Sequence, residues 1–276
     1  LRSWLFVRHG LLNMPSKMNI LCVGDIVGRP GREVLVRTFS RLKETQAIDC
    51  VIVNGENACS GSGILPKHAD DMFQLGVDAI TLGDHVWDKP EIYPYLNEKR
   101  NIIRPGNFPD GAPGVGWSVI QCANKVKVGV INLLGRTFMR YNVSCPFKMF
   151  DQAYEQLIKE TPVIVLDMHA ETTSEKVAMG HYVDGRASLI FGTHTHIQTA
   201  DEKILSKGTA YITDLGMSGP YDSVIGQNKE KIIQRFLTSM PVKFEVAQSE
   251  ATLHGVIATI DTASGRAEHI VRVQER

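Results

Sequence analysis

The sequence lacks three features that would quickly assign a protein to a class: a long apolar run, a paired-cysteine motif and an excess of charge of one sign. No apolar stretch approaches the roughly 20 residues that a helix needs to cross a bilayer. The five cysteines are an odd number with no Cys-x-x-Cys pair, so no disulfide framework is expected. Cys22, Cys50 and Cys122 lie in apolar runs, where a free thiol behaves as a small hydrophobic side chain. This usage predicts a reducing, cytoplasmic location and no membrane segment.

The charge balance gives no sign of a large polyanionic partner. Thirty basic residues match thirty acidic ones, so no overall field draws the chain to nucleic acid or to an anionic membrane. A local basic patch remains open, because net charge says nothing about distribution. By default, the composition favours a small-molecule or short-oligonucleotide substrate.

The first residues differ in character from the rest of the chain. Residues 1–17 begin without Met, carry basic and apolar residues interrupted by His9-Gly10, and lack a small-residue cleavage site. They are expected to be an N-terminal extension or an expression remnant rather than a signal peptide. From Met18 onward no linker, repeat or low-complexity segment divides the sequence. A single domain is therefore predicted over residues 18–276.

Short β-branched runs alternate with amphipathic stretches along the first two thirds of the chain. The runs are typical of strands buried on both faces. They are Met18–Gly24, Cys50–Asn54, Asp78–Gly83, Pro162–Met168 and Ser188–Gly192. Helices are expected near residues 31–46, 66–76, 89–98, 148–160, 172–182 and 226–239. This alternation indicates an α/β fold with helices on the faces of a sheet.

Two regions have an antiparallel pattern instead. Trp117–Ala123 and Val126–Leu134 form a predicted hairpin, and strands are expected near residues 209–213, 242–247, 252–260 and 268–274. A four-layer α/β/β/α sandwich of two mixed β-sheets flanked by helices fits this pattern better than a single parallel sheet. The irregular residues 135–150 are expected to form a small cap segment over the site.

Side chains that can bind metal follow almost every predicted inner strand. They are Asp25, Glu56 with Asn57, Asp84 with His85, His169, and the pair His194 and His196. Each motif alone is more typical of a turn, a helix cap or a hydrogen-bonded core histidine. In open α/β sheets, however, ligands bind outside the carboxyl ends of the strands, and five strands that deliver such residues favour a metal site. Residues i and i+2 of an extended segment point the same way, so His194 and His196 are expected to act together.

The donor set narrows the metal and the chemistry. Three imidazoles with carboxylates and no thiolate suit Mn, Fe or Zn rather than a cysteine-rich structural zinc. The set is too large for one tetrahedral ion, whereas two ions about 3.5–4 Å apart would use all of it, with one carboxylate bridging. Two such ions lower the pKa of a bridging water and neutralise phosphoryl oxygens. Phosphoester hydrolysis is therefore the natural use of this site.

Several long motifs in a fixed order resemble a known family. They are GDIVGRPGR (24–32), VNGENACSGSG (53–63), TLGDHVWDK (81–89), DMHAETTSEK (167–176), GTHTHIQTAD (192–201) and TDLGMSGPYDSVIG (213–226). Together they resemble the YmdB-like branch of bacterial phosphodiesterases, within the calcineurin-like metallophosphoesterase superfamily, over essentially everything from Met18 onward. The resemblance implies hydrolysis of 2′,3′-cyclic nucleotides or related phosphodiesters by a hydroxide that bridges two divalent or mixed-valence metal ions. It favours Fe or Mn, with Zn possible, and implies a homo-oligomer.

The resemblance also implies a role for each site residue. The first metal would be held by Asp25, Asn57 and His196, the second by Asp84, His169 and His194, and Glu56 would bridge the two. His85 would lie beside the metals as the catalytic general acid. The superfamily often has a His two residues after the first Asp; that position is Val27 here, as the YmdB-like branch implies.

One position departs from the family pattern. The Gly-Asn-His of the family reads Gly83-Asp84-His85 in this chain. Aspartate still ligates metal, so metal binding is expected to persist. A third carboxylate would add negative charge, weaken the pull of the ions on bound water and repel an anionic phosphate.

Other interpretations of the same site stay open. The substrate is expected to be a small-molecule phosphodiester or nucleotide, with short RNA ends as a further candidate, but a phosphomonoesterase would use the same site. A metal-bound regulatory protein with little turnover is the alternative from another class. An amidohydrolase is disfavoured, because its His-x-His usually ends the first barrel strand. Arg136 and the Gly-Ser-rich turn at 216–219 are expected to position phosphate or ribose, although Arg136 also suits a strand-end cap.

Overall fold

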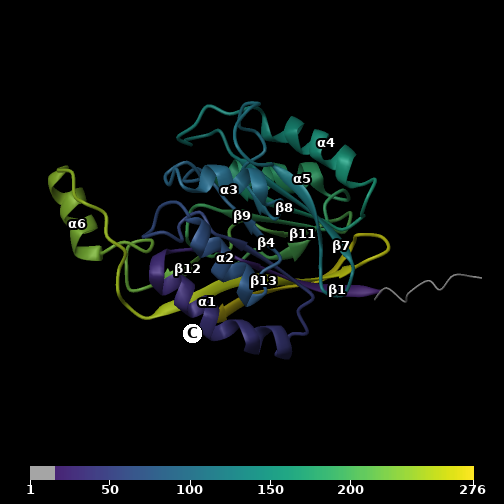
Figure 1. The fold of residues 1–276 in the computed structure, drawn as a ribbon, viewed down its shortest axis with the longest axis horizontal. Helices are drawn as coiled ribbons and strands as arrows, with labels where there is room; N and C mark the ends of the chain where they lie inside the picture. The colour runs from purple at the N-terminus through teal and green to yellow at the C-terminus, as the bar shows by residue number, and fades with distance from the viewer. Residues whose placement is uncertain (1–15) are drawn as a thin grey trace, which may run out of the picture.

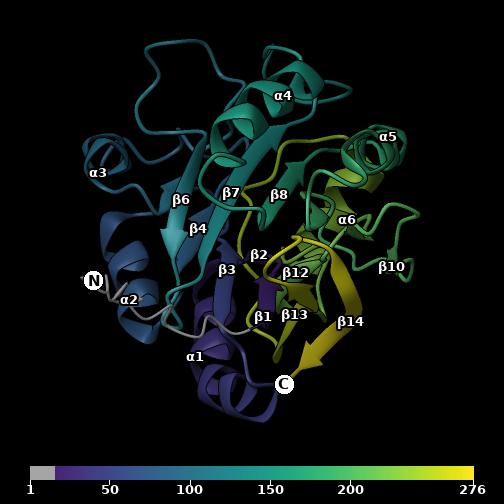
Figure 2. The same ribbon diagram turned by 90° about the vertical axis from the view of Figure 1, so that its right-hand side faces the viewer.

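The computed structural model describes residues 16–276, so residues 1–15 of the expected N-terminal extension lie outside the described part. Within that part, two mixed β-sheets face each other and helices cover their outer faces (Figure 1, Figure 2). The predicted four-layer α/β/β/α sandwich is confirmed. No helix between residues 16 and 276 combines the length and apolar character needed to span a membrane.

The first sheet combines a parallel half with an antiparallel half. Its strands run in the order β2-β12-β13-β1-β3-β4-β5, with β14 also paired to β13. They are β1 (Lys17–Val23), β2 (Asp25–Ile26), β3 (Cys50–Asn54), β4 (Ala79–Thr81), β5 (Ile102–Ile103), β12 (Met217–Pro220), β13 (Ala251–Asp261) and β14 (Ala267–Glu275). The β1, β3, β4 and β5 strands are parallel to one another, so their carboxyl ends meet at one edge.

The second sheet is also mixed and runs in the order β10-β11-β9-β8-β7-β6. Its strands are β6 (Trp117–Gln121), β7 (Lys127–Leu134), β8 (Ile164–His169), β9 (Leu189–Thr193), β10 (Lys203–Ile204) and β11 (Ala210–Ile212). The predicted hairpin is the antiparallel pair of β6 and β7. β7, β8 and β9 are parallel, so His169 and Thr193 end neighbouring strands in register.

The helices occupy the outer layers, except for the last one. They are α1 (Gly28–Thr45), α2 (Pro66–Leu75), α3 (Ile92–Glu98), α4 (Pro146–Leu157), α5 (Thr173–Val183) and α6 (Lys229–Thr238). α1 packs on β12 and β13, and α4 packs on β6 and β7. Figure 1 shows α1 and α2 on one side of the sheets, α4 and α5 on the other, and α6 apart from both groups.

The core consists of three apolar layers, one between the two sheets and one on the outer face of each sheet. Alternate residues of a strand belong to different layers. In β1, Ile20 and Cys22 pack between the two sheets, whereas Leu21 and Val23 pack under the helices on the outer face. Because successive strand residues point to opposite faces, a strand apolar at every position is buried on both sides. The continuous apolar runs of the sequence therefore correctly indicated inner strands.

Three sequence-based expectations need correction. Residues 242–247 form no strand; only Val246 makes an isolated bridge, with Gln227. The expected turn at 216–219 is mostly β12, which pairs with β2 and β13. α4 begins at Pro146 rather than 148, because proline suits the first helical turn, where its missing N–H has no partner to lose.

Candidate metal centre and active site

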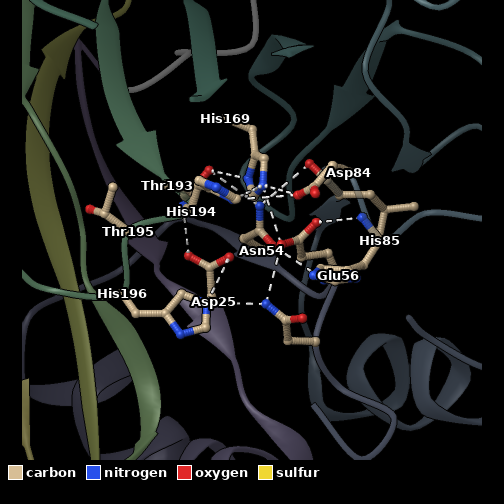
Figure 3. Close-up of polar contacts among 12 residues, drawn as sticks. Asp25, Asn54, Glu56, Asp84, His85, His169, Thr193, His194, Thr195 and His196 are labelled. Carbon is tan, nitrogen blue, oxygen red and sulfur yellow. Dashed lines mark hydrogen bonds and ion pairs between the residues drawn. The ribbon is translucent and has the colours of Figure 1, made fainter. Parts of the chain in front are cut away.

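The predicted ligands gather where the carboxyl ends of the two sheets meet, as Figure 3 shows. Asp25 follows β1, while Glu56 and Asp84 follow β3 and β4 of the first sheet. His169 ends β8, and His194 follows β9 of the second sheet. Each parallel strand therefore delivers its polar side chain to one shared edge, as the sequence pattern predicted.

Four of these side chains form a tight cluster. One ligand atom from each of Glu56, Asp84, His169 and His194 lies within 4.8 Å of the others. The Nε2 atom of His169 is 3.2 Å from Glu56 Oε1, 3.1 Å from Asp84 Oδ1 and 3.1 Å from His194 Nδ1. Two carboxylates and two imidazoles that converge in this way are a donor set for Fe, Mn or Zn.

Gly83 is required for this close approach. A Cβ atom at Gly83 would collide with the Glu56 carboxylate and with the His169 ring. The residue before Asp84 must therefore lack a side chain if the ligands are to converge. This explains physically why a glycine opens the Gly83-Asp84-His85 motif.

A second group of donors lies beside the first. Asp25 and Asn57 are buried, and the Oδ1 atom of each has no hydrogen-bond partner. The Nε2 atom of His196 is 4.0 Å from Asp25 Oδ1 and 3.2 Å from Asn57 Nδ2. A buried carboxylate oxygen without a partner is costly, and burial raises the pKa of Asp25, with opposition from His196 and His169. A cation beside Asp25 and His196 would satisfy the orphaned Asp25 oxygen. Asn57 turns its Nδ2 toward His196 and Glu56, so its amide would have to rotate for Oδ1 to reach the same cation.

Hydrogen bonds fix which nitrogen each ligand histidine presents. The Nδ1 atom of His169 is 2.8 Å from the Thr193 hydroxyl, which donates to Asp167 at 2.6 Å. Thr193 Oγ1 therefore accepts the proton of His169 Nδ1, and Nε2 keeps a lone pair toward the cluster. Burial raises the pKa of Asp167 to about 6, although His169, Thr193, Thr81 and Asn54 lower it.

The other two histidines are arranged in the same way. Nδ1 of His196 is 3.0 Å from the Ile225 carbonyl oxygen, so it donates there. Nε2, which lies 3.2 Å from Asn57 Nδ2, keeps the lone pair that a metal would take. Nε2 of His194 is 3.2 Å from Glu171, so it donates to that carboxylate and leaves Nδ1 toward His169. Outer partners of this kind orient a metal-binding imidazole and set its tautomer.

The His-x-His segment reaches the site by a different geometry from the one expected. β9 ends at Thr193, and His194 and His196 have φ values of 96° and 66°. Both are in left-handed conformations, which are uncommon for residues other than glycine. The two side chains therefore do not act as an extended pair: His194 joins the Glu56 cluster, and His196 joins Asp25 and Asn57.

A buried ion pair holds this turn in place. Lys176 Nζ is 2.6 Å from Asp214 Oδ2, and both side chains are almost fully buried. The same Asp214 oxygen accepts the hydroxyl of Thr195 at 2.7 Å and its backbone N–H at 3.3 Å. Thr195 lies between His194 and His196, so the ion pair fixes the backbone that carries both ligands.

His85 lies beside the cluster and is oriented by Asp88. Its Nδ1 atom is 2.7 Å from Asp88 Oδ2, and its backbone N–H donates to Glu56 at 3.1 Å. Asp88 also accepts hydrogen bonds from the Ser62 hydroxyl and from Arg140. Burial lowers the pKa of His85, but Glu56 and Asp88 raise it, and the net shift is upward. An imidazole that Asp88 orients beside the predicted ligands is well placed to donate a proton.

Arg136 is placed differently from the other predicted residues. Its side chain is exposed, and its backbone N–H donates to the Glu175 carboxylate at 3.1 Å. Four residues were not singled out by the sequence: Asp88, Glu171, Lys176 and Asp214. Only Asp88 had a readable signal, since it lies three residues after His85 and so on the same side of a helical turn.

The site opens into a cavity of about 710 Å³. Glu56, His85, His194 and His196 form part of its wall, and apolar side chains near α6 form another part. The cavity is large enough for a nucleotide-sized ligand. Its lining does not include Arg136 among the residues that the structure describes.

Comparison with known proteins gives consistent matches over nearly the whole chain. A family model described as YmdB-like protein matches residues 21–273. The chain is 48% identical over 256 residues to the 2′,3′-cyclic-nucleotide 2′-phosphodiesterase of Bacillus subtilis (strain 168), covering 93% of this chain and 96% of that protein.

Two solved structures share both the fold and much of the sequence. One is a hypothetical protein from Thermus thermophilus, with a TM-score of 0.86 and 36% identity, covering 94% of this chain and 100% of that one. The other is a novel phosphatase from Mycoplasma pneumoniae, with a TM-score of 0.87 and 35% identity, covering 94% of this chain and 93% of that one.

Proposed function

Because the chain belongs to the YmdB-like family, we propose that it is a dinuclear metal-dependent phosphodiesterase that hydrolyses 2′,3′-cyclic nucleotides or related phosphodiesters. The observation that carries the proposal is the pair of adjoining donor sets: the Glu56, Asp84, His169 and His194 cluster, and the orphaned oxygens of Asp25 and Asn57 beside His196. The substrate class rests on the name of the Bacillus subtilis relative.

The ligand chemistry would suit two ions, Fe or Mn before Zn. Glu56 Oε1 lies 3.2 Å from both His169 Nε2 and Asn57 Nδ2, at the junction of the two donor sets. When bound, the two ions would make a water molecule acidic enough to attack phosphorus and would neutralise the charge of the phosphoryl oxygens. The protein supplies fixed tautomers at His169, His194 and His196, so these imidazoles would need no change of tautomer to bind metal.

The role of His85 follows from its hydrogen bonds. Asp88 accepts from Nδ1 and leaves Nε2 as the nitrogen that can release a proton. Hydrolysis breaks one P–O bond of the cyclic phosphate: the hydroxyl of water goes to phosphorus, and a proton goes to the departing sugar oxygen. His85 Nε2 is the proposed donor of that proton, and Arg140, from the expected cap segment, helps to hold Asp88 in place at 3.3 Å.

The test is turnover of 2′,3′-cyclic AMP and of bis-p-nitrophenyl phosphate in the presence of Mn²⁺, beside the monoesters 3′-AMP and p-nitrophenyl phosphate. The parent is expected to open the cyclic phosphate and to leave the monoesters nearly untouched. His85→Ala is expected to lower kcat by roughly 100- to 10,000-fold. His181→Ala is the matched control, because His181 is exposed on α5.

The monoesterase alternative predicts the opposite order of substrates, with p-nitrophenyl phosphate cleaved faster than either diester. A regulatory protein would bind metal and turn over none of the four. Either result would overturn the proposed activity, and an unchanged kcat in His85→Ala would remove His85 from its role.

A further inference from the structure

The last helix stands on an arm beside the metal centre. We define the α6 arm as residues 228–246, which leave the body and return to it at one place (Figure 1). At its base Gln227 bridges to Val246, and the backbone N–H of Asn228 donates to the Glu245 carbonyl at 2.8 Å. The Asn228 side chain caps α6 by accepting from the Lys231 N–H at 2.9 Å. The arm therefore has a defined internal structure and a narrow attachment.

α6 carries two apolar faces with different surroundings. Ile232, Arg235 and Phe236 are spaced i, i+3 and i+4, so they share one face, and all three line the cavity of the metal centre. Ile233 and Leu237 form the other face and do not line that cavity. Phe236 and Leu237 are equally exposed, at 81% each. Phe236 and Leu237 therefore differ in the face of α6 that they occupy and not in their exposure to solvent.

The cavity face of α6 adds aromatic and cationic surface to the metal centre. Phe236 and Phe244 both line the cavity, and the Arg235 guanidinium carbon lies 5.0 Å from the centroid of the Phe244 ring. Aromatic rings with an arginine plane are a surface on which nucleobases stack. The same cavity holds His194 and His196, so one bound molecule can contact both the metal ligands and this surface.

We propose that the cavity face of the α6 arm, made by Ile232, Arg235, Phe236 and Phe244, is the nucleobase subsite of the enzyme. This inference rests on the proposed function. In a 2′,3′-cyclic nucleotide the phosphate is fused to C2′ and C3′, and the base is attached to the neighbouring C1′. A phosphate held at the metal ligands would therefore have its base one sugar away, and the α6 face lines the same cavity.

Stacking of this kind tolerates different bases, because every base has a π face. The subsite is therefore expected to distinguish substrates with a base from substrates without one, rather than one base from another. The outward face, with Ile233 and Leu237, is not part of the subsite.

The experiment compares kcat/KM for 2′,3′-cyclic AMP and for glycerol 1,2-cyclic phosphate, which keeps the five-membered cyclic phosphate but has no base. The parent is expected to prefer the nucleotide by about tenfold or more. In Phe236→Ala that preference should fall by about tenfold, through a higher KM for the nucleotide. Leu237→Ala should keep the parental preference. Light scattering on all three proteins reports whether either change alters the oligomeric state.

Each outcome separates the subsite from the proposed function. Equal efficiency of the parent on the two substrates, or an equal loss on both in Phe236→Ala, would overturn the subsite and leave the phosphodiesterase intact. The same fall in preference in Leu237→Ala, together with a change of oligomeric state, would mean that the arm acts through a subunit contact, which also overturns the subsite. No hydrolysis of either substrate by the parent would instead overturn the proposed function.

Discussion

Single residues decide how much charge the metal centre carries. Asp84 adds a third carboxylate beside Asp25 and Glu56, at the position where the family resemblance leads one to expect Asn. Burial opposes its ionisation, but interactions with the His169 and His194 rings lower the pKa of Asp84 far below the ordinary value, so it is charged. A charged ligand attracts the metal more strongly and repels an anionic phosphate more strongly than an amide does.

Replacing Asp84 by Asn is therefore expected to raise turnover of the cyclic phosphate, by roughly two- to tenfold, and to weaken metal retention. Steady-state kinetics at saturating Mn²⁺ separates the two effects, because metal loss is then compensated. Equal or lower kcat in Asp84→Asn under these conditions would show that the extra carboxylate does not restrain the enzyme.

His254 gives the fold a dependence on pH that is separate from the metal centre. Its ring stacks on Tyr221 with the centroids 4.3 Å apart, and burial lowers the pKa of His254 to about 4. In the unfolded chain the histidine has its ordinary pKa of about 6.5. Between about pH 6.5 and 4 the unfolded chain therefore binds a proton that the folded chain does not bind. This contribution to stability is complete above about pH 6.5 and is lost as the pH falls toward 4.

Between pH 7 and pH 5, the free energy of unfolding should lose about 1–2 kcal/mol through His254. His254→Phe keeps the stacking and cannot titrate, so its loss over the same interval should be smaller by that amount. Urea unfolding of both proteins at the two pH values measures the difference. An identical loss in parent and variant would contradict the assignment.

At the scale of elements, the buried pair of Lys176 on α5 and Asp214 after β11 joins the second sheet to the ligand turn. Removing one partner of a buried ion pair leaves an uncompensated charge. Lys176→Met is therefore expected to lower the free energy of unfolding by about 3–5 kcal/mol. Metal affinity should fall as well, since Thr195 and its flanking histidines lose their support.

Thermal unfolding and metal titration of Lys176→Met, with Lys148→Met as the control, test this expectation. Lys148 is an exposed lysine on α4, so its loss should leave both quantities unchanged. A Lys176→Met protein with parental stability and metal affinity would show that the pair does not position the turn.

The sequence predicted the elements whose patterns are local. Inner strands were recognisable because they are apolar at every position, and the ligands because polar residues interrupt those runs at the same edge. The strand predicted at residues 242–247 was wrong. The segment VKFEV alternates like a strand, but it lies on the α6 arm, where only Val246 has a bridging partner. β12 was missed because its residues, Met217–Pro220, are poor strand formers that pairing with β2 and β13 nevertheless holds extended.

The outer partners of the ligands could not be predicted from the sequence. Glu171 and Asp214 meet His194 and Thr195 only after the chain has folded, and an acidic residue in a loop has no distinctive local pattern. The left-handed φ values of His194 and His196 are likewise imposed by tertiary contacts. The residues that gather at the shared edge were therefore predictable, whereas the geometry that brings them together was not.

At the scale of the whole molecule, the metal centre joins the two sheets. Asp25, Glu56 and Asp84 come from the first sheet, and His169, His194 and His196 come from the second. Metal bound between them would hold both halves of the sandwich together and would stabilise the folded state over the unfolded chain. Because two donor sets adjoin at one edge, the arrangement predicts the number of ions that the protein binds.

The most direct measurement is therefore the metal content of the purified protein by mass spectrometry after reconstitution with Mn²⁺, with Asp25→Ala beside it. We predict about two ions per chain in the parent and about one in Asp25→Ala, which leaves the Glu56 cluster intact. A circular dichroism spectrum of the variant serves as the check on folding. A parent that binds no ion, or only one, would contradict the dinuclear centre.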